Sequence, residues 1–480
     1  MQSPNFESFI FSNGSISACY WNTTLGVPCQ QGSVPTIGVD ARSVGDIQAA
    51  VNFAVKHDLR LSVKNTGHDY LGRSTARGSF MIWTHYLKNI TYNSSFVPEG
   101  APSTEIYNAI TLEAGVQWHE AYDAVQAQGR VLVGGLSAGG SVGSAGGWLL
   151  GGGHSAISPQ HGLGVDNVIE LNVVTSTGEY LTVNLHKHSD LFWALRGGGG
   201  GTYGVVTSVT YRTHPSVPLT AIFFAANSTN NSTFKTFFTE FVRIHPNLPD
   251  EGFSGYSLVA PNGIQCFYIA PNVTQAQANK TFDSFAFAQN LTSEGLSIST
   301  ALTVPYPSFY SWYTSLFSTG QQVGTITDMA SRLISRDTVE QNPQGIANAV
   351  LSMGAASWDF VAGGAVSKVA HDSTGLNPAW RKALVHVVWG IGWDEGTPTS
   401  EIKKLRAKLA QSLTDVNRLT GSSAYFNEAS MFEPSPKYTF FGDHYDRLKA
   451  IKNAYDPTGL FVVKEGVGSD DWDKSLNCRI

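Results

Sequence analysis

The chain has 480 residues, of which 42% are hydrophobic and 14% charged, and its net charge is −6. This length predicts two domains, and the composition is that of a globular protein. The sequence has neither the basic cluster that nucleic-acid binding requires nor an apolar run near the ~20 residues of a membrane helix. We therefore expect neither nucleic acid nor a membrane as a partner.

The first 33 residues are expected to form an irregular arm. Cys19 and Cys29 lie ten residues apart and either close a disulfide in an oxidising compartment or stay as two thiols. Cys266 lies in an apolar run and is expected to be a buried thiol, with a bond to Cys478 left open. The opening Met-Gln-Ser-Pro has no charged-then-apolar signal segment, so we interpret the chain as a mature form.

Ten N-x-[ST] motifs are the second indication of compartment. One such motif is weak evidence, but ten in mostly polar, turn-like stretches favour the secretory path and an extracellular protein. The asparagines are Asn13, Asn22, Asn89, Asn93, Asn227, Asn230, Asn231, Asn272, Asn279 and Asn290.

From Val34 the hydrophobic pattern becomes regular and predicts a compact α/β unit. A strand (36–39), a helix capped by Ser43 or Asp46 (47–57) and a second strand (60–63) lead into a loop at 64–73. Further strands are predicted at 80–83, 109–112 and 131–133, with a helix at 118–128.

Strands at 168–175 and 180–183 are joined by Ser-Thr-Gly-Glu, which predicts a hairpin. A helix (190–195) and a strand (205–211) follow, and Pro215 and Pro218 mark a boundary. Beyond it, helices at 234–244 and 402–419 alternate with aromatic-rich strands, which predicts an α+β domain with helices on one face of a sheet. A last helix is predicted near 445–455.

The loop 64–73 is the first candidate site. It follows a strand directly, and Gly67 permits close approach, so its N–H groups can face a pyrophosphate while His68 faces the ligand. An ordinary turn with a surface histidine is the alternative.

The second candidate is the glycine-rich segment 134–153, which holds ten glycines. Ordering so many glycines is entropically costly unless something packs against the backbone, and a flat, polyanionic cofactor does so. The phosphate-loop motif G-x-x-x-x-G-K-[ST] is absent, and the G-x-G-x-x-G at 199–204 precedes a strand where a dinucleotide fold needs a helix.

Two other chemistries match short patterns. G-x-S-x-G occurs around Ser137 and Ser141, but a serine-hydrolase elbow needs a helix straight after the serine, and this tract is poor in helix formers. His186 and His188 form an H-x-H pair near Asp190 with no third ligand apparent. A solvated loop is the preferred interpretation of that pair, and no metal site is predicted.

Four segments in one order resemble the vanillyl-alcohol-oxidase superfamily of flavoproteins, and within it the fungal berberine-bridge-enzyme-like oxidases. They are Lys64-Asn65-Thr66-Gly67-His68-Asp69-Tyr70, the glycine-rich segment, Gly162–Val168 with Leu191–Gly204, and Asp456–Phe461. The resemblance covers nearly the whole chain. It implies an α+β, two-domain fold in which residues 1–214 and 432–480 bind FAD and residues 215–431 form an antiparallel-sheet substrate domain covered by helices.

By the same resemblance, His68 bonds covalently to the flavin 8α-methyl carbon. Many relatives attach the flavin a second time through a cysteine, but Gly140 occupies that place here, so a single bond is expected. The other residues that the resemblance places on FAD are Lys64, Asn65, Thr66, Gly67, Asp69, Gly134, Gly135, Ser137, Gly139, Gly140, Gly143, Ser144, Gly147, Trp148, Gly151, Gly204, Val205 and Tyr445.

The family's activity implies hydride transfer from a substrate C–H to flavin N5 while a base takes a proton from the adjacent O–H or N–H. Tyr425–Glu428 resembles the family's Y-x-N-[Y/H/E] strand, which makes Glu428 the first candidate base, with Tyr70 and Asn427 beside it. Burial is expected to raise the pKa of Glu428 towards neutrality. We expect a monomeric, secreted oxidase that uses molecular oxygen on a sugar, alcohol or secondary metabolite. The alternatives are a dehydrogenase with another acceptor and a catalytically degenerate flavin-binding glycoprotein.

Overall fold

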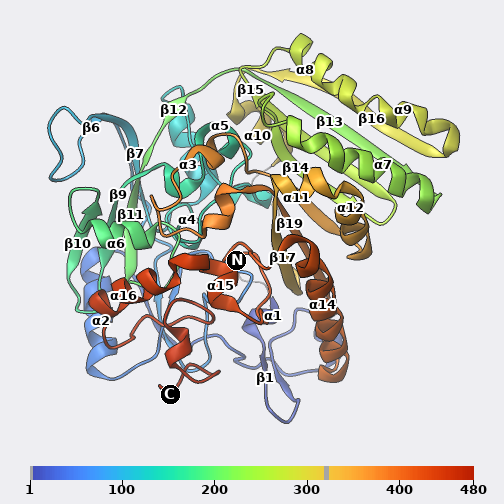
Figure 1. Cartoon of the computed structure of the whole chain (residues 1–480). Coiled ribbons are helices and arrows are strands. Elements are labelled where there is room, and N and C mark those ends of the chain that lie inside the picture. Colours follow the sequence, from blue (N-terminus) through green and yellow to red (C-terminus); the bar gives the residue numbers. More distant parts are fainter. Residues whose placement is uncertain (1–3, 318–323) are drawn as a thin grey trace.

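The computed structural model describes residues 4–317 and 324–480, and most of its strands belong to three sheets (Figure 1). The smallest is parallel, in the order β3 (Ile37–Asp40), β5 (Phe80–Trp83) and β4 (Leu61–Lys64). The helix α2 (Val44–Lys56) follows β3 and begins earlier than predicted, because the Ser43 hydroxyl accepts the Asp46 N–H and caps it.

The second sheet is antiparallel and has the order β10-β9-β11-β7-β6. Its β9–β10 hairpin confirms the one predicted from Ser-Thr-Gly-Glu. The edge strand β6 was not predicted, because its sequence is mostly polar and its residues are exposed or only half-buried. The strands are β6 (Ile90–Phe96), β7 (Tyr107–Glu113), β9 (Val168–Val174), β10 (Tyr180–Asn184) and β11 (Val205–Arg212).

The third sheet has seven antiparallel strands in the order β16-β13-β15-β14-β18-β19-β17. Helices cover one of its faces (Figure 1), as the alternation of helices and aromatic strands predicts. The helix α7 (Asn231–Ile244) packs four phenylalanines against Phe224 and Trp358 of the sheet. The strands are β13 (Leu219–Ser228), β14 (Ser254–Ala260), β15 (Gly263–Pro271), β16 (Leu296–Tyr306), β17 (Thr327–Ser335), β18 (Ala356–Phe360) and β19 (Ala383–Gly392).

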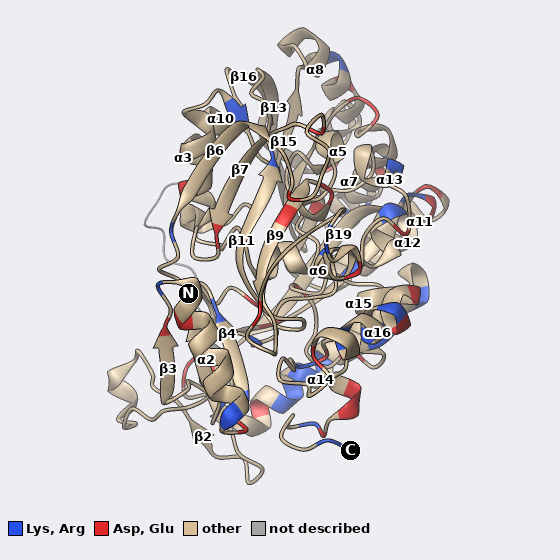
Figure 2. Cartoon of the chain, turned by 90° about the vertical axis from the view of Figure 1, so that its left-hand side faces the viewer, with Lys and Arg blue, Asp and Glu red and all other residues tan. Residues whose placement is uncertain are grey.

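The remaining helices connect and cover these sheets. Charged residues lie along α14 and α16, and most of them are Lys or Arg (Figure 2). Within the described residues, no helix has the length and apolarity to cross a bilayer. These helices are α1 (Pro4–Glu7), α3 (Trp118–Gln126), α4 (Gly147–Leu150), α5 (Ser158–His161), α6 (Ser189–Leu195), α8 (Gln275–Phe282), α9 (Phe287–Asn290), α10 (Phe309–Leu316), α11 (Arg336–Gln341), α12 (Pro343–Ser352), α13 (Ala365–Lys368), α14 (Thr399–Thr420), α15 (Pro436–Phe441) and α16 (Tyr445–Tyr455).

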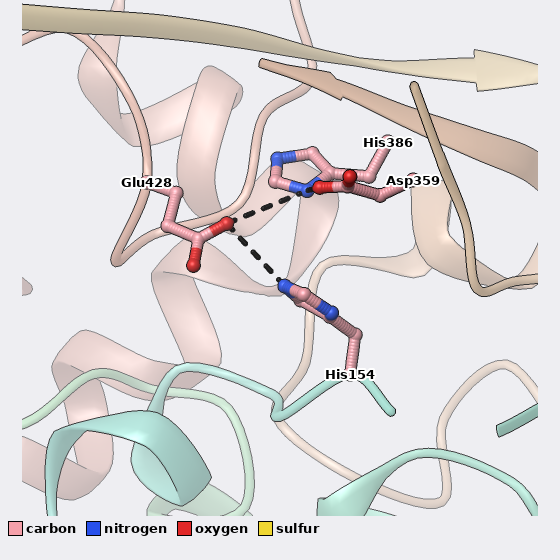
Figure 3. Close-up of side chains that lie close together, drawn as sticks. All are labelled: His154, Asp359, His386 and Glu428. Atoms are coloured by element: carbon pink, nitrogen blue, oxygen red, sulfur yellow. Dashed lines mark hydrogen bonds and ion pairs between the residues drawn. The ribbon is translucent and has the colours of Figure 1, made fainter. Parts of the chain in front are cut away.

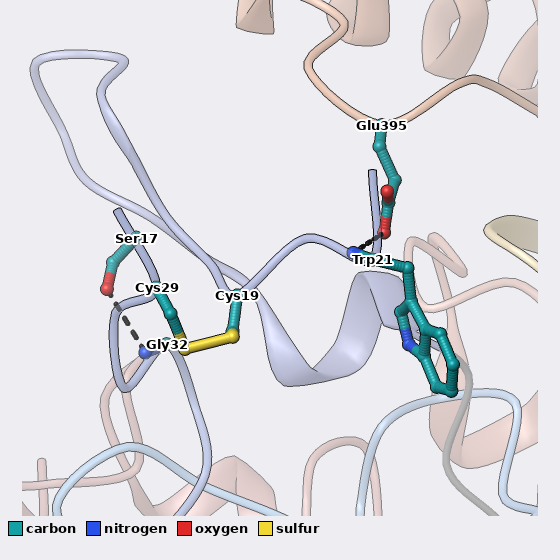
Figure 4. The surroundings of a disulfide bond; sticks show 6 residues. All are labelled: Ser17, Cys19, Trp21, Cys29, Gly32 and Glu395. Carbon is teal, nitrogen blue, oxygen red and sulfur yellow. Dashed lines mark hydrogen bonds between the residues drawn. A yellow bond between two sulfur atoms is a disulfide. The ribbon is translucent and has the colours of Figure 1, made fainter. Parts of the chain in front are cut away.

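The N-terminal arm is more ordered than predicted. It contains a short antiparallel hairpin of β1 (Phe9–Ile10) and β2 (Ile16–Ser17), in which Phe9 pairs with Ser17 and Ile10 with Ile16. Cys19 and Cys29 form a disulfide (Figure 4), which confirms that pairing. Cys266 is a buried free thiol and Cys478 an exposed one, so the bond between them that was left open is not formed.

The C-terminal residues return to the N-terminal sheets. The buried Lys452 ammonium donates to the carbonyls of Thr202 and Phe461 and to the carboxylate of Asp456, each at 2.8 Å. These bonds fasten the C-terminal segment of the chain to the glycine-rich stretch at residues 197–204. The C-terminal part of the chain is therefore anchored to the N-terminal half.

Candidate active site

A cavity of about 420 Å³ opens between the parallel sheet, the glycine-rich segment and a turn at residues 425–428. It is lined by the loop 64–73, by residues of 135–150 and 200–206, and by Phe461 and Val463. A volume of this order is typical of a site for a small ligand or cofactor. Both segments that the sequence predicted as candidate sites, the loop 64–73 and the glycine-rich segment, thus line the same cavity.

The loop 64–73 is held in shape by its own side chains. The Asp69 carboxylate accepts the N–H groups of Leu71 (3.2 Å) and Arg73 (2.7 Å) and pairs with the Arg73 guanidinium at 3.1 Å. The guanidinium also lies 3.5 Å from the centre of the Phe426 ring and donates to the Phe426 carbonyl. Gly67 has φ 87°, a left-handed conformation that favours glycine and turns the chain just before His68.

His68 lines the cavity with a neutral imidazole. Burial lowers the pKa of His68 to about 3. Its Nε2 lies 2.9 Å from the Ser141 hydroxyl, which donates its hydrogen to the Ala138 carbonyl (3.1 Å). Because that hydroxyl has one hydrogen to give, His68 Nε2 carries the proton and donates, which leaves the lone pair on Nδ1. Nδ1 is therefore the nucleophilic nitrogen of this side chain.

The glycine-rich segment follows a path that larger residues cannot follow. Gly139 and Gly140 have φ of 65° and 58°. A Cβ at Gly143 would overlap the amide nitrogen of Asn65, and one at Gly140 would overlap Tyr313 and His119. At Gly143 the segment therefore packs its backbone directly against the Asn65 side chain of the loop 64–73.

Most of the residues that the resemblance placed on FAD lie on the cavity wall. Those that line it are Asn65, Thr66, Gly67, His68, Asp69, Gly135, Ser137, Gly143, Gly147, Trp148 and Gly204. Others lie behind the wall or away from it: Lys64, Gly134, Gly139, Gly140, Ser144, Gly151, Val205 and Tyr445. Tyr445, for example, donates to Asp470 and accepts the Gly468 N–H, and the role predicted for these residues stays a prediction.

The residues of the two competing short patterns make local contacts instead. The Ser141 hydroxyl donates to a carbonyl rather than to His68, and only the 3₁₀ turn Ala138–Gly140 separates it from Ser137, so neither serine sits on a hydrolase elbow. His186 pairs with Glu105 at 2.8 Å, and His188 lies 3.3 Å from the Tyr455 hydroxyl on an exposed loop.

Residues 425–428 form a turn, not the predicted strand, because the Glu428 N–H bonds to the Tyr425 carbonyl at 3.2 Å. The Asn427 amide donates to the Gly147 carbonyl at 2.6 Å and to the Tyr425 hydroxyl at 2.8 Å. The Asn427 carbonyl accepts the Tyr70 N–H at 3.4 Å. Asn427 thus ties the turn to both the glycine-rich segment and the loop 64–73, and Tyr70, Asn427 and Glu428 all line the cavity.

Glu428 faces a buried cluster of side chains (Figure 3). Its Oε2 lies 3.3 Å from His154 Nε2 and 3.6 Å from His386 Nδ1, and His386 Nδ1 lies 3.5 Å from the Asp359 carboxylate. Burial raises the pKa of Glu428, but His154, His386 and His68 together lower it further, so the net shift is downward. The predicted rise towards neutrality is therefore wrong, because the sequence did not reveal these neighbouring histidines.

Two pKa shifts accompany that of Glu428. Burial raises the pKa of the Tyr70 hydroxyl, and the Glu428 carboxylate raises it further. Burial lowers the pKa of His154, but Glu428 and Asp359 raise it more, and the result is a net rise. The ionised carboxylate of Glu428 thus stands at the cavity wall between the imidazole of His154 and the neutral phenol of Tyr70.

Sequence reasoning missed Ser141, His154, Asp359 and His386. Ser141 and His154 lie within or next to the glycine-rich segment, where the serine drew attention only as a hydrolase candidate. Asp359 belongs to β18 and His386 to β19, which pair directly, with Asp359 opposite His386. No short motif joins these positions, so only the strand register could have found them.

The residues present fit an FAD. Both polar atoms of the Asn65 amide are buried without a hydrogen-bond partner at the cavity wall, as expected for a group that a ligand would satisfy. The wall also exposes glycine backbone at Gly147, whose Cβ position is clear of protein atoms, and at Gly200. His68 Nδ1 supplies a nucleophile in the same cavity.

Two family models match the chain. One describes an FAD binding domain and matches residues 35–184, and the other, described as berberine and berberine like, matches residues 424–468. Together they span the loop 64–73, the glycine-rich segment and the turn at 425–428. All three of these segments line the cavity.

Individual relatives agree. An uncharacterized FAD-linked oxidoreductase of Arthroderma benhamiae is 39% identical over 100% of this chain and 84% of its own length. The crystal structure of the VAO-type flavoprotein MtVAO615 from Myceliophthora thermophila aligns with a TM-score of 0.85 and 30% identity, covering 94% of this chain and 84% of the other. MtVAO713 of the same fungus aligns with a TM-score of 0.88 and 26% identity, covering 100% and 90%. The chain therefore belongs to the VAO-type, berberine-bridge-like family of FAD-dependent oxidoreductases.

Proposed function

We propose that this chain is a secreted oxidase that carries one FAD bonded to His68 and oxidises a C–H next to a hydroxyl or amine of a small organic substrate. The observation that carries the proposal is the His68 imidazole, neutral and lining the cavity with its Nδ1 lone pair free of the Ser141 contact. When bound, FAD accepts hydride from the substrate and passes two electrons to oxygen, giving hydrogen peroxide.

A single covalent attachment is supported by the cysteines and by Gly140. Cys19 and Cys29 are bonded to each other, Cys266 lies in the core of the seven-stranded sheet, and Cys478 is exposed near the C-terminus. None of the four lines the cavity. A side chain at Gly140 would overlap Tyr313, so this position has no room for a second attachment.

Glu428 is the proposed proton acceptor. It is ionised, it lines the cavity, and one of its carboxylate oxygens points away from the two imidazoles (Figure 3). Tyr70 lines the same cavity and stays protonated, which suits it to donate a hydrogen bond to a substrate oxygen. Asn427 is a positioning residue, because its amide is occupied by Gly147 and Tyr425.

Secretion is supported by the disulfide and by exposure of the glycosylation motifs. The Cys19–Cys29 bond requires an oxidising compartment to persist (Figure 4). All ten asparagines of the N-x-[ST] motifs are exposed, so each is accessible to a glycosyltransferase. Glycans at these positions would lie on the surface and would not disturb the core.

Oxygen is the proposed acceptor, and a relative called a VAO-type flavoprotein oxidase, from Thermothelomyces thermophilus, is 32% identical over 100% of this chain and 82% of its own length. Peroxide yield per turnover separates an oxidase from a dehydrogenase. Anaerobic bleaching of the flavin against sugars, alcohols and phenolics identifies the substrate class, and no bleaching by any of them indicates a degenerate site.

The covalent bond is tested with His68→Ala. After acid denaturation and gel electrophoresis, wild-type protein should retain flavin fluorescence, and His68→Ala should lose it completely. The exposed His188→Ala serves as control and should retain it. Fluorescence that persists in His68→Ala, or its absence from the wild type, would overturn the proposed attachment.

A further inference from the structure

The structure assigns a second, unrecognised site: we propose that His154, Asp359, His386 and Glu428 bind one Zn²⁺ at the wall of the flavin cavity. These four side chains are called the cluster below. One ligand atom from each lies within 4.8 Å of the other three. The sequence predicted no metal site, because the four residues come from four distant segments. The inference goes beyond the proposed oxidation and does not depend on the flavin.

The spacing within the cluster matches a metal site better than a hydrogen-bond network. Three separations between nitrogen and oxygen atoms are 3.3, 3.5 and 3.6 Å. Charge-assisted N–H···O bonds are about 2.7–2.9 Å long, so these contacts are too long for strong hydrogen bonds. Ligands at about 2.0–2.1 Å from a tetrahedral zinc are about 3.3 Å apart. These three nitrogen–oxygen separations are therefore close to the edge length of such a tetrahedron.

His386 is a second and independent indication. Its side chain is completely buried, and neither of its ring nitrogens has a hydrogen-bond partner. Its Nδ1 faces the carboxylates of Asp359 and Glu428, and the close-up shows the imidazole directed into the cluster (Figure 3). A buried imidazole without a partner is costly, and coordination to a metal would satisfy the nitrogen.

Charge balance and donor type select a divalent transition metal. Two carboxylates meet in a mostly buried place, and one divalent cation would balance both, with each imidazole binding it through a lone pair. Mg²⁺ and Ca²⁺ prefer sites made only of oxygen, whereas a pair of imidazole nitrogens with carboxylates suits Zn²⁺. His154 and Glu428 line the cavity, which supplies the path by which an ion enters.

The surroundings orient the ligands as metal sites require. The Tyr256 hydroxyl lies 3.4 Å from His154 Nδ1, which leaves His154 Nε2 for the ion. The Ser357 hydroxyl donates to Asp359 Oδ1 and leaves Oδ2 facing His386. Such outer partners fix the tautomer and direction of the ligands. Zinc can take a fifth ligand. A substrate hydroxyl that reached the ion from the cavity would bind as that ligand, and its pKa would be lowered.

The test is zinc binding by the intact flavoprotein. Wild-type protein dialysed against Zn²⁺ and then against buffer should retain one zinc per chain by mass spectrometry, and titration should show at least a 100-fold loss of affinity in His386→Ala. Mg²⁺ should not compete. The matched control is His371→Ala, because His371 and Asp443 are exposed beside the buried His444 and form the other group that could bind zinc, adventitiously.

Two further measurements keep the outcome clear. Covalent flavin fluorescence reports that each variant is folded, and Asp359→Asn replaces His386→Ala if the latter fails to fold. Zinc should also raise the melting temperature of the wild type but not of the His386 variant. The site would be overturned by any of three results: the wild type retains no zinc, His386→Ala retains it, or only His371→Ala loses it. Each result leaves the flavin bond of His68 to be judged separately by its fluorescence.

Discussion

Two walls of the same cavity are built in different ways. The backbone wall is the glycine-rich segment 134–153, which gives shape through main-chain conformation and close packing against Asn65. The side-chain wall is the cluster of His154, Asp359, His386 and Glu428, which gives charge and proton-accepting groups. The first is contiguous in sequence and the second is assembled by strand pairing. We therefore expect the backbone wall to set where the cofactor lies and the side-chain wall to set what is done to the substrate.

The largest expected effect comes from the side-chain wall. Glu428→Gln removes a proton acceptor but keeps the size of the side chain, so the rate of flavin reduction should fall by about 10²–10⁴-fold. Anaerobic stopped-flow absorbance with a reducing substrate measures that rate, and covalent flavin content should stay unchanged.

Glu401→Gln is the control for this variant, because Glu401 is an exposed residue of α14 that pairs with Lys404. It should reduce at the wild-type rate. If Glu428→Gln also reduces within a factor of three of the wild type, the proton acceptor lies elsewhere and the division between the two walls fails.

How much could be read from the sequence follows the same division. The loop 64–73, the glycine-rich segment and the β9–β10 hairpin were predicted because their signals are contiguous. The turn at 425–428 was predicted as a strand. The bond that closes it joins the main chains of Glu428 and Tyr425, so it leaves no signal in the side-chain sequence. The pairing of Asp359 with His386 depends on the register of β18 against β19.

The backbone wall is tested next. Gly143→Ala should reduce covalent flavin incorporation at least fivefold and destabilise the fold by about 1–3 kcal/mol, because the new Cβ overlaps the Asn65 amide. In-gel fluorescence and thermal unfolding measure the two effects. Gly146→Ala is the control, since its Cβ would lie 3.8 Å from the same amide, an ordinary contact. Equal behaviour of the two variants would mean that the wall is not sterically tight.

A third prediction concerns a region outside both walls. Cys19→Ser/Cys29→Ser opens a loop of ten residues, which should cost about 2–3 kcal/mol of stability and expose the arm near Trp21 to protease. Near Trp21 the arm is also held by Glu395, which accepts the N–H groups of Trp21 (2.9 Å) and Asn22 (2.8 Å). Limited proteolysis and thermal unfolding report the loss, and Cys478→Ser should change neither. A protease-resistant double variant would show that the remaining contacts of the arm suffice.

The smallest expected effect tests whether a carboxylate can be buried close to Arg73 of the cavity wall without a hydrogen-bond partner. Burial raises the pKa of Glu465 to about 7, and its Oε2 is buried with no hydrogen-bond partner. A carboxyl group whose folded pKa is raised costs nothing below its unfolded pKa of about 4.5, destabilises the fold progressively as pH rises from there to about 7, and exerts its full cost above 7. Glu465→Gln should therefore stabilise the protein by about 1–2 kcal/mol at pH 8 and by almost nothing at pH 4.5.

Denaturant unfolding of Glu465→Gln at the two pH values measures that difference, and the exposed Glu294→Gln is the control that should show none. The sign is the decisive point, because Lys464 and Arg73 act in the opposite direction and lower the pKa of Glu465. If the variant is less stable at pH 8 than the wild type, the ionised carboxylate is favourably paired in the fold. The attraction of Lys464 and Arg73 would then outweigh the cost of burying the Glu465 carboxylate. The cluster of His154, Asp359, His386 and Glu428 would remain as the one proposed place where charge is buried at the cavity at a cost.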